Sequence, residues 1–297
     1  MVQAGGHMTL HELLLAPFAD FAFMRRALVG ACILSVSACP VGVFLMLRRL
    51  SLTGDAMAHA ILPGAAVAYL FYGLAILPMT FGGLAAGVLV ALAAGAVSRL
   101  TIQREDASLA AFYLISLALG VLLVSLRGSS VDLMHVLFGT VLALNDEALL
   151  LIGAIASLTV LALVTMWRPL FAECLDPSFL RSVSRAGPAA HFVFLLLVVL
   201  NLVGGFQALG TLLAVGLMML PAAAARFWFR DLEPMCLTAI GIGLLSSYVG
   251  LLASYHWSVA SGPAIILTAG VAYAASLAFA PRGILFSRLR SQRHRTA

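Results

Sequence analysis

Residues 191–228 read HFVFLLLVVLNLVGGFQALGTLLAVGLMMLPAAAARFW, and His191 and Arg226 are the only ionisable side chains in this run. A membrane-spanning helix needs about 20 predominantly apolar residues, so the run is too long for one crossing. The glycines of GGFQALG, residues 204–210, favour a break between two spans. This stretch therefore predicts a bundle of membrane-spanning helices.

The composition extends this prediction to the whole chain. Of its 297 residues, 63% are hydrophobic and 10% are charged, and the mean hydropathy is +1.09. Soluble domains are about one quarter charged. Backbone groups in hydrocarbon must be hydrogen-bonded within the chain, which favours helices. We expect an all-α polytopic membrane protein with about eight or nine transmembrane helices, forming a single transmembrane domain over residues 1–297 with a membrane region at about 20–280.

Apolar runs between charged or Gly/Pro-rich segments indicate where the spans lie. The predicted spans are residues 27–47, 56–72, 79–98, 107–126, 148–167, 189–204, 208–228, 236–256 and 263–280.

The arginines predict the orientation of these spans. All 17 basic residues are arginine, and basic residues concentrate in cytoplasmic loops. With the N-terminus outside, only Arg25, Arg26 and Arg127 face the exterior, and the opposite orientation reverses this ratio. We therefore expect the basic tail, residues 281–297, to be cytoplasmic and to contact anionic lipid headgroups.

Two polar segments interrupt the apolar runs. Residues 168–188 lie on the predicted cytoplasmic side, and their mixture of acids and arginines suits a short helix that contacts a partner. Residues 127–147 lie on the predicted outer side and are half apolar, which favours a position in the membrane interface.

Asp55 and His59 lie in SLTGDAMAHAILPG, residues 51–64, at the head of a predicted span. Their i, i+4 spacing places both side chains on one face of a helix. Ionisable groups in a span are costly unless they face the bundle interior and find a partner, so they indicate function. The structural alternative is that Asp55 caps the helix and His59 is a hydrogen-bonded structural histidine.

A carboxylate and an imidazole together suit manganese, iron or zinc, whereas Cu(I) prefers sulfur ligands. One chain offers only two ligands at this place. Two copies related by a two-fold axis would supply two aspartates and two histidines. The pair therefore predicts a homodimer with a shared metal site.

Other polar motifs give weaker predictions. Asp132 and His135 are three residues apart in the outer segment, where they would form an outer part of a metal pathway or an exposed interfacial turn. The remaining histidines, His191 among them, are assigned to interfaces and loops. The chain has no lysine and therefore no G-x-x-x-x-G-K-[ST] phosphate-binding loop, so any ATP hydrolysis must come from another polypeptide. We find no catalytic constellation and predict that the chain is not an enzyme.

Five ordered motifs resemble the membrane permeases of bacterial ABC importers for manganese, zinc and chelated iron, the ABC-3 family. The resemblance covers about residues 20–280. The motifs are RRLSLTGDAMAHAILPGAAVAY (48–69), VDLMHVLFG (131–139), DPSFLRSVSRAG (176–187), GTLLAVGLMMLPAAAARFW (210–228) and SGPAIIL (261–267).

The resemblance implies a homodimeric permease in the bacterial inner membrane. Its partners would be cytoplasmic ABC ATPase subunits and a periplasmic or lipoprotein metal-binding protein, and ATP would drive alternating access. Asp55 and His59 would contact the transported metal, and no permanently bound cofactor is implied. The segment with Asp176, Pro177, Arg181 and Gly187 would form the coupling helix that contacts the ATPase.

Two departures and one alternative accompany this resemblance. Many relatives carry a glycine soon after the DP element, where this chain has SVSRAG, and an acidic or proline residue before SGP, where this chain has WSVA. The alternative function is a secondary, ion-coupled metal transporter that uses Asp55 and His59 as a proton relay. The ligand types suit manganese and zinc nearly equally, so the sequence does not choose the metal.

Overall fold

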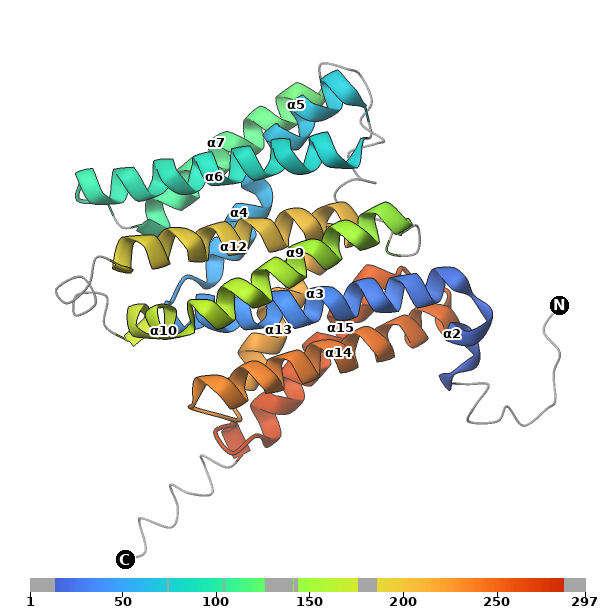
Figure 1. The fold of residues 1–297 in the computed structure, drawn as a ribbon. Coiled ribbons are helices and arrows are strands. Elements are labelled where there is room, and N and C mark those ends of the chain that lie inside the picture. Colours follow the sequence, from blue (N-terminus) through green and yellow to red (C-terminus); the bar gives the residue numbers. More distant parts are fainter. Residues whose placement is uncertain are drawn as a thin grey trace, which may run out of the picture.

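The structure is a computed structural model that describes residues 14–73, 75–103, 105–125, 141, 144–175 and 186–285. Over these ranges the chain forms helices joined by short turns, with no strand (Figure 1). The helices are α2 (Ala16–Asp20), α3 (Ala22–Leu47), α4 (Ser51–Ala60), α5 (Leu62–Tyr72), α6 (Ile76–Leu100), α7 (Glu105–Ser125), α9 (Asp146–Thr165), α10 (Trp167–Leu175), α12 (Ala186–Leu209), α13 (Thr211–Ala225), α14 (Leu232–Trp257) and α15 (Ser261–Phe279).

The all-α membrane fold is confirmed. Six described helices, α3, α6, α9, α12, α14 and α15, contain segments long and apolar enough to cross a bilayer. The apolar part of α7 and the whole of α13 are shorter. The break expected within residues 204–210 is present, because α12 ends at Leu209 and Gly210 has a φ of 94° before α13 begins. A glycine suits this position, since side chains disfavour a positive φ.

The second predicted span differs from the structure. It was expected as one segment over residues 56–72, but the chain forms α4 and α5 with a break at Ile61. Pro63 has no backbone N–H, so the His59 carbonyl cannot accept its usual helical hydrogen bond. The N–H of Ile61 donates to that carbonyl instead, and the Ser116 hydroxyl of α7 donates to the Ala60 carbonyl at 2.9 Å. The break therefore has its own hydrogen-bond partners.

The helices form two groups, with α4 between them. In Figure 1, α5, α6 and α7 lie together at the top, while α3, α9, α12 and α14 lie below them. Helix α4 runs obliquely between these groups and contacts α3, α6, α7, α12 and α13. Helix α3 packs closely against α13, since a Cβ on Gly42 would overlap the Met218 carbonyl. The position of α4 makes it the central connection of the bundle.

The turns of the bundle gather at two ends. The turn at residues 48–50, the turn at 101–103, helix α10 and the turn after α13 lie at the left end in Figure 1. Helix α2 and the turn between α14 and α15 lie at the right end. The left end carries arginines that the sequence pattern assigns to one side of the membrane, including Arg48, Arg49, Arg226 and Arg230.

Candidate functional site

Helix α4 buries nearly every side chain except those on one stripe. Leu52 is 81% exposed, and the side chains of Asp55 and His59 are 66% and 29% exposed. These three positions are spaced i, i+3 and i+7, which places them along one side of the helix. The other described side chains of α4 are buried, and they are Thr53, Ala56, Met57, Ala58 and Ala60. A helix at the centre of the bundle thus leaves one polar stripe uncovered.

The structure brings Asp55 and His59 together as their spacing predicts. Asp55 Oδ1 lies 3.8 Å from His59 Nε2, which is beyond hydrogen-bond distance. Two ligands that each lie about 2.1 Å from one metal ion at a tetrahedral angle are about 3.4 Å apart. A small side-chain rotation would therefore let both atoms contact one ion. Asp55 does not cap α4, because that helix has no side-chain cap and Asp55 lies inside it.

Helix α7 supports the His59 side of this site. The Tyr113 ring stacks on the His59 ring with centroids 6.3 Å apart, and Ser116 binds the carbonyl at the end of α4. His59 Nδ1 is buried and has no hydrogen-bond partner among the residues that the structure describes. Tyr113 is not apparent from the sequence, because its apolar helix gives no sign of which residue meets α4.

By itself the pair would be only part of a metal site. No group of three or more histidine, cysteine, aspartate or glutamate side chains is arranged for a metal ion within the part of the chain that the structure describes. Two protein ligands are fewer than the four of a closed tetrahedral site. The exposure of Asp55 leaves its carboxylate open to further ligands from outside this chain.

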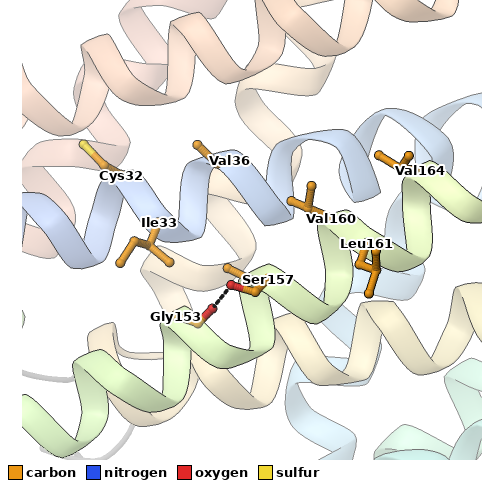
Figure 2. A pocket seen from close by; sticks show the side chains of 9 residues that line it. Cys32, Ile33, Val36, Gly153, Ser157, Val160, Leu161 and Val164 are labelled. Atoms are coloured by element: carbon orange, nitrogen blue, oxygen red, sulfur yellow. Dashed lines mark hydrogen bonds between the residues drawn. The ribbon is translucent and has the colours of Figure 1, made fainter.

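A groove between α3 and α9 has a different character (Figure 2). It has a volume of about 640 Å³ and is lined by Cys32, Ile33, Val36, Gly153, Ala156, Ser157, Val160, Leu161 and Val164. The Ser157 hydroxyl donates to the Gly153 carbonyl at 2.8 Å, as Figure 2 shows. No carboxylate or imidazole lines this groove, so it does not suit a divalent cation.

A buried ionic cluster lies where α3 ends. Arg48 Nη2 donates to Glu173 Oε1 at 3.3 Å and to His191 Nδ1 at 2.8 Å, and the Arg48 guanidinium lies 4.9 Å from the Phe194 ring centroid. A guanidinium only donates, so Nδ1 is the acceptor and carries no proton in this contact. His191 does not lie in a loop, because it is inside α12 near the start of that helix and joins this cluster.

The thiol of Cys174 lies beside this cluster on α10. Burial raises the pKa of the Cys174 thiol to about 11. The thiolate is the reactive form, so this cysteine should react slowly at neutral pH. The rate at which a thiol reagent labels Cys174 can therefore report a change in the position of α10.

Several predicted residues have no described surroundings. Asp132, His135, Asp176, Pro177 and Arg181 lie outside the described residues. Gly187 is placed in the first turn of α12, after the described chain resumes at residue 186. The roles predicted for these residues stay predictions.

Comparisons with known proteins give a consistent result. The sequence pattern of the ABC 3 transport family matches residues 20–280. The chain is 32% identical to the manganese import system permease protein ScaB of Streptococcus gordonii, over 89% of this chain and 93% of the relative. It is 31% identical to the manganese transport system membrane protein MntC of Halalkalibacterium halodurans, over 92% and 93% respectively.

A solved structure shares the fold. It is described as PsaBC from Streptococcus pneumoniae in complex with Fab, and the match covers 96% of this chain and 100% of the matched chain. The TM-score is 0.83 and the sequence identity is 28%. The helical arrangement described above is therefore present in a solved structure of a related chain.

Proposed function

The chain belongs to the ABC 3 transport family, and we propose that it is the membrane permease of a manganese importer with Asp55 and His59 as metal ligands. It is a multi-pass membrane transport protein. The observation that carries the ligand assignment is the exposed stripe of α4, where these two side chains lie on a helix that is otherwise buried.

The chemistry of the pair supports a divalent transition metal as the transported substrate. An Asp carboxylate and a His imidazole are borderline ligands that bind manganese, iron and zinc. Manganese is favoured because the relatives ScaB and MntC are named as manganese transport proteins. Zinc and iron are the competing cargoes.

Two copies of the chain would complete the site. If the stripes of two α4 helices face each other across a two-fold axis, the metal meets two carboxylates and two imidazoles. The exposure of Leu52 and Asp55 supports this arrangement, since a large apolar and an acidic side chain lie together on an uncovered face.

ATP hydrolysis would come from a separate partner. The chain has no lysine and so no P-loop of its own. Cytoplasmic ABC ATPase subunits would contact the segment with Asp176, Pro177, Arg181 and Gly187, and an exported metal-binding protein would deliver the ion at the other side. The bacterial inner membrane is the corresponding location, with residues 281–297 in the cytoplasm.

The mechanism follows from ligands placed on a short broken helix. Broken helices are where transporters place midplane sites. Asp55 and His59 would hold the ion between the two copies, and a rearrangement of the copies would open the site to alternate sides of the membrane. Histidine contributes a neutral nitrogen ligand, so metal binding competes with protonation of His59.

The proposal is tested by reconstituting the permease with its ATPase and binding protein in liposomes. We expect ATP-dependent uptake of radioactive Mn²⁺, and unlabelled Mn²⁺ should compete better than Zn²⁺ or Fe²⁺. Equal or better competition by Zn²⁺ would overturn the choice of manganese. Metal transport by the permease without its ATPase would instead favour the ion-coupled alternative and contradict the importer.

A further inference from the structure

Arg48 connects the entry of α4 with two other helices. It follows the last residue of α3, and after a turn in which Arg49 has a φ of 60° the chain enters α4 at Ser51. The Arg48 side chain is 9% exposed and that of Glu173 on α10 is 2% exposed. Arg48 also contacts His191 and the Phe194 ring on α12. One buried side chain thus links α10 and α12 to the turn between α3 and α4.

The partners of Arg48 flank the proposed ATPase-contact segment on both sides. Glu173 lies on α10, just before residue 176, and His191 lies on α12, just after residue 187. Residues 176–185 therefore lie in the chain between the two helices that carry these partners. Both partners converge on the residue that leads into α4.

The ion pair uses only part of its hydrogen-bonding capacity. Arg48 Nη1 and Glu173 Oε2 are buried and have no partner among the described residues. A bidentate pair would satisfy both atoms, and buried groups that are left unsatisfied are costly. The pair is held by one hydrogen bond at 3.3 Å, and a bidentate arrangement would require Arg48 and Glu173 to shift relative to one another.

We propose that Arg48 and Glu173 are positioning residues that transmit displacement of residues 176–187 to α4, and thereby to Asp55 and His59. This inference rests on the proposed function, because it assigns a route between the ATPase and the metal ligands. The physical basis is a contiguous buried link whose two ends lie on different helices.

Three variants separate this role from a purely structural one. In Arg48→Met/Glu173→Met the ionic link is replaced by apolar side chains of similar size, which preserves packing without leaving a buried charge. Glu173→Gln keeps the volume and an acceptor but removes the charge. Arg49→Met is the matched control, because it removes the same charge from the neighbouring, exposed arginine.

The complex of permease, ATPase and binding protein is reconstituted for each variant. We expect Arg48→Met/Glu173→Met to assemble, bind Mn²⁺ and hydrolyse ATP like the wild type. The number of Mn²⁺ ions moved per ATP should fall by about tenfold. For Glu173→Gln, the number of Mn²⁺ ions moved per ATP should lie between the values of the wild type and the double variant. For Arg49→Met, this number should match that of the wild type.

Two cysteine thiols report displacement of the helices at the two ends of this link, α10 and α4. Cys174 reports on α10, and a cysteine introduced by Leu52→Cys on the exposed side of α4 reports on the metal helix. We expect ATP to change the labelling rates of both thiols in the wild-type background, measured by peptide mass mapping. In Arg48→Met/Glu173→Met, ATP should still change the labelling rate of Cys174 but not that of the thiol on α4.

The possible results have distinct meanings. A double variant that transports with the wild-type ratio, or in which the α4 thiol still responds to ATP, overturns the link. Failure of both Glu173→Gln and the double variant to assemble, with Arg49→Met intact, would show that the pair only supports folding and would also overturn it. A wild-type complex that does not transport Mn²⁺ would instead contradict the proposed function.

Discussion

Asp55 and His59 show how two residues define a site that their surroundings must complete. Their helical spacing brings carboxylate and imidazole to 3.8 Å, while the i and i+4 rule alone predicts only that they share a face. The stacked Tyr113 ring restricts His59 on one side. Asp55 has no such cover, so its position depends on what faces α4 in the assembled transporter.

Asp55→Ala and His59→Ala are expected to abolish Mn²⁺ transport without preventing assembly of the complex. Each substitution removes a side chain that we propose as a metal ligand and adds no buried charge, and loss of metal affinity should be at least about tenfold. Mn²⁺ uptake in liposomes and size-exclusion chromatography of the complex measure the two properties. Asp146→Ala is the control, because this exposed acid pairs with Arg26 on the surface. Wild-type uptake in either ligand variant would reduce the pair to a structural role.

At the scale of elements, α4 depends on tight packing around the break at Ile61. Gly64 of α5 and Gly82 of α6 approach so closely that a Cβ on either would overlap the carbonyl of the other. Gly120 of α7 lies against Leu62 and Pro63. Small residues at helix contacts allow such close approach in membranes, and they keep α5 in the direction that the break requires.

Gly64→Ala is expected to separate α5 from α6. The added methyl meets backbone, which cannot rotate away, so the free energy of unfolding should fall by about 1–3 kcal/mol. Gly95→Ala in α6 is the matched control, because no heavy atom of another described residue outside α6 lies within 4 Å of a Cβ built there. Its effect should stay within about 1 kcal/mol. Thermal unfolding in detergent compares the two variants with the wild type. Equal unfolding midpoints for Gly64→Ala and Gly95→Ala would refute the close contact between Gly64 and Gly82.

The segment at residues 176–187 is expected to act as a separate element. Arg181→Glu reverses a charge that we assign to the ATPase contact, so electrostatic complementarity should be lost. We expect weaker association with the ATPase or loss of metal-stimulated ATP hydrolysis, measured by co-purification and phosphate release. Unchanged assembly, hydrolysis and uptake would remove Arg181 from the contact.

At the scale of the whole molecule, we propose that the chain supplies half of a metal site. The uncovered stripe of α4 carries the two proposed ligands, and a second copy is the simplest source of the others. Two-fold symmetry would place equivalent residues of the two stripes near one another at the axis.

Leu52→Cys is expected to form a disulfide between two copies in a background without the native cysteines. Leu52 lies on the same side of α4 as His59, so its counterpart in the partner should be near. Leu150→Cys on α9 is the control, since Leu150 is also exposed, at 75%, but lies on another helix. Mild oxidation and non-reducing electrophoresis detect the covalent dimer. Equal crosslinking at the two positions would argue against an interface centred on α4.

The sequence by itself determined the membrane fold, the approximate helices and the proximity of Asp55 to His59. These are consequences of apolar run length and of the helical repeat, which act locally along the chain. Gly210 similarly marked the break between α12 and α13.

Only the tertiary structure decided that α4 and α5 are separate helices, that α4 leaves one stripe uncovered and that Arg48 meets Glu173 and His191. The positive-inside rule explains why Arg48 lies at a helix end but not which acid it finds. Ion pairs and exposed faces depend on how distant helices pack, and no local sequence period encodes which helices become neighbours.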